Sequence, residues 1–193
     1  MADIKNEEEI KVSLIVEDGS CVPSANSYVS LEYADEYMRN TGKTSWLSKS
    51  EDERKSYLIN ATRYIDRTYS QIGWKGQKKY HRRQALCFPR VELFDKDGDE
   101  VLGIPEELKQ AVCEAGFIAV TTSLFTINSA SGEVKKKKAE TLEIEYFSSG
   151  ETAKGYISRF SVLDSLLVGF YKTKNDYCRI KRAIHTDLLG GRI

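Results

Sequence analysis

Long hydrophobic runs and a surplus of charge of either sign are both missing from this 193-residue sequence. No apolar stretch approaches the roughly 20 residues that a membrane-spanning helix needs, so we expect no membrane segment. Lysine plus arginine and aspartate plus glutamate number 29 each, and the formal net charge is zero. Free-standing nucleic-acid binders usually have a basic surplus, so this balance argues against that class but allows a local basic surface. It also favours self-association, because long-range repulsion between copies is weak.

Cysteine and histidine are scarce as well. The four cysteines lie far apart and form no Cys-x-x-Cys pair, and the chain has two histidines. We therefore expect no metal site, and without a recognisable secretory segment we expect no disulfide and a reducing cytoplasm. A nucleophilic pair of Cys87 with His81 stays open as a remote alternative, but no orienting carboxylate is recognisable beside it. A buried structural cysteine is the preferred interpretation, and we expect neither an enzyme nor a cofactor.

Two further patterns resemble ligand sites only in part. The stretch Thr41–Thr44 reads Thr-Gly-Lys-Thr, like the end of a phosphate-binding loop, but Tyr37 stands where that loop needs a glycine. A turn that ends a helix explains it better. Alternate aspartates at 95–99 have calcium-loop spacing, yet Glu100 replaces the required glycine, which favours a solvated hairpin turn.

The remaining pattern predicts a mainly α fold, a helical bundle of about four helices with an N-terminal strand and a β-arm insertion. Residues 10–16 alternate as a strand does, and a hairpin arm is expected at about 133–147. Ser30 caps the first helix, Ser50 with Glu53 forms a capping box for the second, and Pro105 begins the third. The helices are expected at residues 31–40, 51–69, 105–127 and 157–171.

The chain divides into three parts by composition. Residues 1–9 form a polar flexible tail, residues 10–174 a single helical domain, and residues 175–193 a C-terminal extension that mixes basic and apolar side chains. We see no internal repeat.

Cations and aromatic rings gather between residues 73 and 90. That mixture suits single-stranded nucleic acid, whose phosphates meet lysine and arginine while its bases stack on aromatic rings. The preferred alternative is an exposed loop that Trp74 anchors to the core. The candidate DNA-facing residues are Trp74, Lys75, Lys78, Lys79, Tyr80, Arg82 and Arg83.

Five segments, in this order, resemble a family of tailed-bacteriophage head-to-tail connector proteins that are often labelled DnaT-like ssDNA-binding. The first contains Pro-x-Ala-Asn-Ser-Tyr-Val, the second a Trp-x-Gly and a Pro-Arg signature, and the third Ile-Pro-x-x-Leu-x-x-Ala. The segments are Val16–Ser30, Gly73–Arg90, Ile104–Ala111, Val134–Tyr146 and Phe160–Phe170. The chain departs from the family at Cys21 and Ser24, where glycine is common, and in the tail after Tyr171.

The resemblance implies a structural virion protein, an adaptor that assembles in the host cytoplasm and stays at the head-tail junction. Such adaptors form a ring, commonly twelvefold, below the portal, extend the DNA channel and dock tail or neck proteins. The implied partners are the portal, a tail protein, further copies of the chain and, non-specifically, the DNA in the channel. The alternative is the literal label, a single-stranded DNA-binding protein acting in phage replication. The C-terminal extension is the candidate portal-docking segment, through Arg179, Lys181, Arg182, Leu188 and Leu189.

Overall fold

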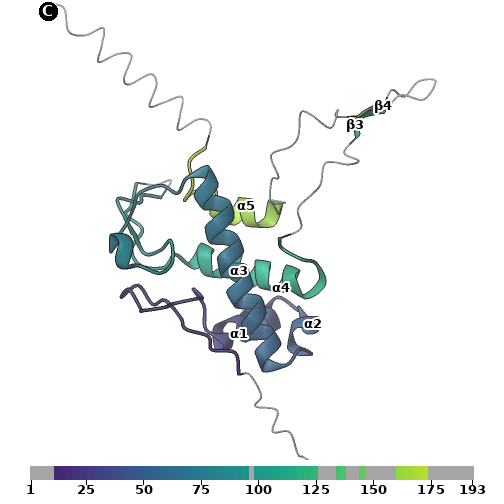
Figure 1. The fold of residues 1–193 in the computed structure, drawn as a ribbon, viewed down its shortest axis with the longest axis horizontal. Helices are drawn as coiled ribbons and strands as arrows, with labels where there is room; N and C mark the ends of the chain where they lie inside the picture. The colour runs from purple at the N-terminus through teal and green to yellow at the C-terminus, as the bar shows by residue number, and fades with distance from the viewer. Residues whose placement is uncertain (1–10, 96–97, 126–133, 138–143, 147–159, 174–193) are drawn as a thin grey trace, which may run out of the picture.

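The computed structural model describes residues 11–95, 98–125, 134–137, 144–146 and 160–173 (Figure 1). Five α-helices provide most of the regular structure in these residues, which confirms the predicted mainly α fold. A four-helix bundle is not confirmed, because the helices differ greatly in length and α4 crosses the long helix α3 (Figure 1). The helices are α1 (Leu31–Asn40), α2 (Thr44–Leu47), α3 (Glu51–Ile72), α4 (Glu106–Thr121) and α5 (Ser161–Leu167). None of the described helices is long and apolar enough to cross a bilayer.

The first two predicted helices begin where their caps predict. Ser30 Oγ accepts the N–H of Tyr33 at 3.2 Å and caps α1. Ser50 and Glu53 form the expected capping box of α3, which continues to Ile72, three residues beyond the predicted end. The short helix α2 between them was not predicted, because its four residues show no periodic pattern.

The last two predicted helices are shorter than expected. Helix α4 begins at Glu106, directly after Pro105, which stands at the N-cap position without a side-chain hydrogen bond. It ends at Thr121 instead of about residue 127, because Thr122 turns to an extended backbone. Helix α5 ends at Leu167 instead of residue 171, because Tyr171 forms an antiparallel bridge with Trp74. Residue 127, where the third helix was predicted to end, and residue 157, where the fourth was predicted to begin, both lie outside the described residues.

The predicted N-terminal strand is wrong. Within the described residues of this segment, Val16 forms only a single parallel bridge with Ser27. The side chain of Asn26 takes the place of a neighbouring strand, since it accepts the N–H of Ile15 at 2.8 Å and donates to the carbonyl of Ser13 at 2.9 Å. Local hydrogen bonds within this turn therefore satisfy a backbone whose alternation alone predicts a ladder.

Two short antiparallel pairs complete the described structure. Strand β1 (Gln77–Lys78) pairs with β2 (Arg90–Val91). Strand β3 (Val134–Lys137) pairs with β4 (Ile144–Tyr146), which places a hairpin within the predicted arm. In the part of the chain that is described, no group of three or more histidine, cysteine or acidic side chains is arranged to hold a metal ion.

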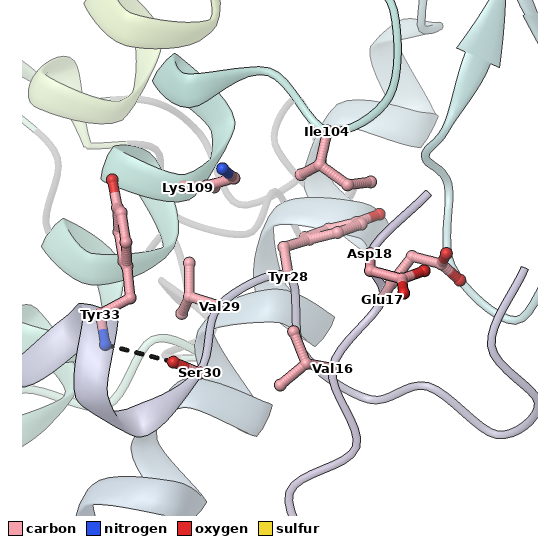
Figure 2. Close-up of a pocket in the computed structure, with 9 residues that line it drawn as sticks. All are labelled: Val16, Glu17, Asp18, Tyr28, Val29, Ser30, Tyr33, Ile104 and Lys109. Carbon is pink, nitrogen blue, oxygen red and sulfur yellow. Dashed lines mark hydrogen bonds between the residues drawn. The ribbon is translucent and has the colours of Figure 1, made fainter. Parts of the chain in front are cut away.

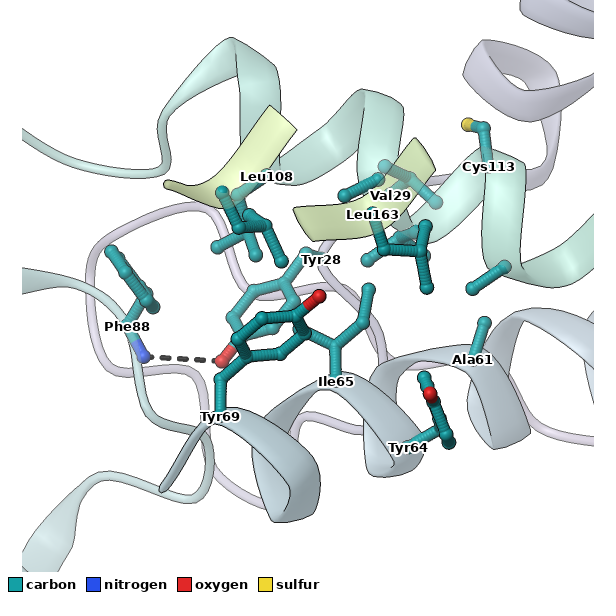
Figure 3. Close-up of a cluster of buried hydrophobic side chains, with 14 of the residues drawn as sticks. Tyr28, Val29, Ala61, Tyr64, Ile65, Tyr69, Phe88, Leu108, Cys113 and Leu163 are labelled. Atoms are coloured by element: carbon teal, nitrogen blue, oxygen red, sulfur yellow. Dashed lines mark hydrogen bonds between the residues drawn. The ribbon is translucent and has the colours of Figure 1, made fainter. Parts of the chain in front are cut away.

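The core lies where α4 packs on one face of α3 and α5 packs on α4 (Figure 3). One face of α3 is buried, including Leu58, Ile65 and Tyr69, each at most 1% exposed. Leu108 of α4 and Leu163 of α5 face it with no exposed surface. This single core supports one end of the basic segment, because Phe88 is buried in the same cluster.

Candidate nucleic-acid interface

The cluster predicted to face DNA lies in the first part of the connection between α3 and α4, residues 73–91, here called the basic loop. Strands β1 and β2 pair at its two ends, with Gln77 opposite Val91, and a 3-10 turn, His81–Arg83, lies between them. Gly76 makes this closure possible. Its φ is +63°, and a Cβ there would lie 2.4 Å from the carbonyl oxygen of Val91, so no other residue fits without a shift.

Trp74 anchors the basic loop to the core. Its side chain is only 6% exposed, and its ring meets Phe88 edge-to-face at 5.0 Å and lies 5.5 Å from Tyr69. The backbone of Trp74 also forms a bridge with Tyr171. Two hydrogen bonds flank this bridge: Lys75 N–H donates to the Phe170 carbonyl at 2.8 Å, and Lys172 N–H donates to the Gly73 carbonyl at 2.8 Å. The ring therefore has no open face for a nucleic-acid base, although its residue was a candidate for that role.

Arg90 is the residue that holds the basic loop in shape, a role that sequence reasoning missed. The side chain is 9% exposed, and its guanidinium donates to three backbone carbonyls: Lys75 at 2.6 Å, Gly76 at 2.7 Å and Cys87 at 3.1 Å. Burial lowers the pKa of Arg90 from its ordinary value. The only signal in the sequence is the Pro-Arg pair, which the resemblance includes without explaining it.

The cations of the basic loop that reach solvent come from its middle. Lys79, Arg82 and Arg83 are exposed, while Lys75 and Lys78 are half-buried. Tyr80 is also half-buried, its ring lies under the Lys79 ammonium at 5.3 Å, and its hydroxyl donates to the carbonyl of Gly19 at 3.5 Å. The outer surface thus offers positive charge with little aromatic area, an arrangement that can neutralise phosphate but can stack few bases.

A buried polar junction supports the other end of the basic loop. Tyr28 Oη donates to Asp66 Oδ1 at 2.7 Å and accepts the N–H of Phe88 at 3.1 Å, as Figure 3 shows for the second bond. Asp66 Oδ2 also accepts the N–H of Cys87 at 2.9 Å. Burial, opposed by these hydrogen bonds, raises the pKa of Asp66.

The structure gives Cys87 a structural environment. Burial and the neighbouring Asp66 raise the pKa of the Cys87 thiol to about 11, and its sulfur lies 3.2 Å from Ser70 Oγ. A thiol with that pKa is protonated at neutral pH and is a weak nucleophile, which opposes the pairing with His81. Within the described residues, no hydrogen bond joins Cys87 to His81, which is exposed in the 3-10 turn.

The other sequence candidates have separate outcomes. Lys43, from the stretch that resembles a phosphate-binding loop, forms an ion pair with Glu114 and lies over the rings of Tyr37 and Phe117, so it is occupied in packing α1 on α4. The hairpin turn predicted near 95–99 is present: Asp95 N–H donates to the Asp99 carbonyl at 2.9 Å. The candidate portal-docking residues, 179 to 189, lie outside the described residues.

Comparison with known proteins adds one finding. Residues 12–183 match the family model described as "Putative DnaT-like ssDNA binding protein". No curated protein and no solved structure matches the chain. The matched span includes the turn before α1, the basic loop and every described helix, and its description carries the DnaT-like label without mention of a head-to-tail connector. The chain therefore belongs to the DnaT-like family.

Proposed function

We propose that this chain binds DNA non-specifically through its phosphates, using the exposed cations of the basic loop, and that it catalyses no reaction. The burial of Trp74 carries this proposal, because it leaves Lys79, Arg82 and Arg83 outside while removing the largest ring from the surface. The description of the family, which names single-stranded DNA binding, supports DNA as the ligand. We accordingly place the protein among weak, charge-driven DNA binders.

The expected affinity follows from the contacts that remain. Stacking on an aromatic ring contributes about 1–3 kcal/mol per base, and Tyr80 is the one tyrosine, tryptophan or phenylalanine of the basic loop whose ring is partly exposed. For single strands, each phosphate contact lowers the slope of log K against log salt concentration by about 0.7. Three cations therefore predict a slope of about −2. Binding is therefore expected at low salt and should largely vanish at physiological salt.

Fluorescence anisotropy of a labelled single-stranded oligonucleotide tests this proposal. The double variant Arg82→Glu with Arg83→Glu should lose at least about tenfold in affinity, because two attractive contacts become repulsive. The matched control reverses two cations outside the loop, Lys49→Glu with Arg63→Glu, and should bind nearly as the parent does. No binding by the parent at low salt, or equal losses in both variants, would reject the proposal.

A head-to-tail adaptor in the virion of a tailed phage is the second candidate. The ordered segments that resemble the connector family favour it, as does the combination of a buried Trp74 with zero net charge. These features suit incidental contact with channel DNA better than a dedicated single-strand binder. In this role the chain assembles as a ring, of twelve copies by analogy with the family, and binds the portal and a tail or neck protein.

Co-purification with the portal of the same phage, followed by electron microscopy, tests the adaptor role. Truncation after Lys174 should abolish portal association if the C-terminal extension docks there. The Arg82→Glu, Arg83→Glu variant should still bind the portal, which separates this role from DNA binding. Failure of the full chain to join the portal would reject the adaptor, and normal association of the truncated chain would reject the docking segment.

A further inference from the structure

A groove follows the seam between α1 and the beginning of α4. It consists of two neighbouring hollows, of about 330 and about 260 Å³, and Tyr33 lines both of them. The first hollow has an apolar floor that includes Val16, Val29 and Ile104 (Figure 2). Lys109 extends from α4 beside it, with its ammonium 5.7 Å from the centre of the Tyr33 ring. We call the two hollows together the α1–α4 groove.

The second hollow combines two carboxylates, Glu36 and Glu106, with tyrosine hydroxyls and side-chain amides. Glu106 is already engaged, because it accepts from the hydroxyl of Tyr33 and pairs with Lys109 at 3.3 Å. The hydroxyl of Tyr37 donates in turn to Glu114 at 2.7 Å. Burial and these carboxylates raise the pKa of both tyrosines, so the hydroxyls stay neutral and their protons stay directed at the acids.

Glu36 is the acceptor in the α1–α4 groove that is open to a partner. Its side chain is exposed, and among the described residues it has no hydrogen bond or ion pair. A carboxylate beside tyrosine and amide side chains fits a guanidinium or ammonium group, because such groups donate several hydrogen bonds and cancel the charge. The groove is therefore suited to a basic segment that also brings aliphatic or aromatic carbon for the apolar floor.

The basic loop has this composition, but it does not occupy the groove of its own chain. Cys21 Sγ donates to the Arg83 carbonyl at 3.5 Å and the Tyr80 hydroxyl contacts Gly19, so the loop is held against the turn before α1. No ion pair between described residues joins the loop to the groove. Within the described part of one chain, the loop cations and the groove carboxylates therefore do not neutralise one another.

We propose that the α1–α4 groove binds the basic loop of a second copy of this chain, with Arg82 and Arg83 directed at Glu36. The contact joins two different surfaces, so each copy keeps a free loop at one side and a free groove at the other. Repetition of such a contact gives a closed ring or an open filament, depending on the rotation between copies. The inference goes beyond DNA binding and does not depend on it, but the two compete for the same cations.

Sedimentation velocity without DNA tests the contact, at low and at high salt. The parent should self-associate at low salt and dissociate at high salt, because the attraction is between exposed charges. The loop variant, Arg82→Glu with Arg83→Glu, and the groove variant, Glu36→Lys, should each weaken association at least about tenfold. The Lys49→Glu, Arg63→Glu control should associate as the parent does.

An equimolar mixture of the two variants provides the decisive measurement. The acidic loop of one variant complements the basic groove of the other, so the mixture should associate although neither variant does so alone. The Glu36→Lys variant should bind DNA at least as well as the parent, because its basic loop is intact and no longer occupied by a groove, and this measurement shows that the variant is folded. A parent that stays monomeric at low salt, or a mixture that stays dissociated, would overturn the proposal whatever the DNA measurement shows.

Discussion

Tyr28 and Asp66 are joined by a 2.7 Å hydrogen bond, although 38 residues separate them in the chain. The bond connects the turn before α1 to the last third of α3. The same hydroxyl accepts the N–H groups of Cys87 at 2.9 Å and Phe88 at 3.1 Å, so the basic loop is fastened at this point as well. Three distant segments therefore depend on one phenolic oxygen.

Replacement of Tyr28 by phenylalanine should destabilise the fold. The change leaves the buried Phe88 N–H and the Oδ1 of Asp66 without their partner, while the Cys87 N–H keeps Asp66 Oδ2, and the loss costs about 1–3 kcal/mol. Urea unfolding measures the loss. Tyr57→Phe is the matched control, since the described structure shows no hydrogen bond of the Tyr57 hydroxyl, and its effect should stay within about 0.5 kcal/mol. Equal losses in the two variants would contradict the role given to Tyr28.

The stability that Asp66 contributes should fall as pH rises. Burial raises the pKa of Asp66 above its ordinary value of 3.8, so the folded state favours the protonated acid. Its contribution is therefore complete below about pH 4 and is lost as pH rises through the higher pKa of the folded state. Tyr28 and Cys87, which face it, stay neutral in this window because their own pKa values are raised.

Urea midpoints of the parent and Asp66→Asn, measured across this range, test the direction. The asparagine does not titrate, so the stability of the parent minus that of the variant should decrease from pH 4 upward. Exposed carboxylates contribute equally to both proteins and cancel in the difference. A difference that increases with pH would show that hydrogen bonding, not burial, dominates the pKa of Asp66.

Gly76→Ala should be much more destabilising than Gly42→Ala. Both glycines have positive φ, +63° and +72°, so each alanine pays about 1–2 kcal/mol for the left-handed backbone. Only at Gly76 does the new Cβ also meet a backbone oxygen, at 2.4 Å, whereas Gly42 has nothing within 4 Å. The clash should add about 1–3 kcal/mol. Thermal unfolding of the two variants measures this difference directly, and similar melting temperatures would contradict the closure of the basic loop.

DNA binding should leave the intrinsic tryptophan fluorescence nearly unchanged. The chain has two tryptophans, and both are buried: Trp46 is 0% and Trp74 6% exposed. Neither ring can stack on a base in this structure. A titration with oligonucleotide should therefore raise the anisotropy of labelled DNA without quenching the protein. Strong quenching would show that Trp74 leaves the core and would restore base stacking as the mode of binding.

Local sequence signals predicted the features that depend on a few neighbouring residues. The caps Ser30 and Ser50 placed the beginnings of α1 and α3 at the residues where the structure has them. The backbone also accounts for the two positions at which the chain departs from the glycines common in the connector family. Cys21 and Ser24 have φ values of +71° and +59°, which glycine adopts most easily.

Features that depend on distant partners could not be predicted in this way. The alternation of residues 10–16 indicates a strand, but Asn26 satisfies the backbone there instead. The acidic residue Asp66 follows the buried Ile65 on α3, and no nearby signal shows that Tyr28 and Cys87 will surround it. The shortening of α5 depends likewise on a bridge to a residue almost a hundred positions away.

The sequence by itself determined a helical protein with zero net charge and a segment rich in cations and aromatic rings. It also contains, in order, the motifs that resemble the family. Only the tertiary structure decided what that loop can do. Trp74 packs against Tyr69 and Phe88 in the core, because burial of a large ring is favourable. Arg82 and Arg83 stay exposed, because burial of a charge without a partner is costly and the described chain offers them none. The same folding brings α1 beside α4 and so creates the acidic groove opposite in charge to the loop. Composition shows that the charges balance, but only the fold determines which of them, such as Glu36, Arg82 and Arg83, stay exposed.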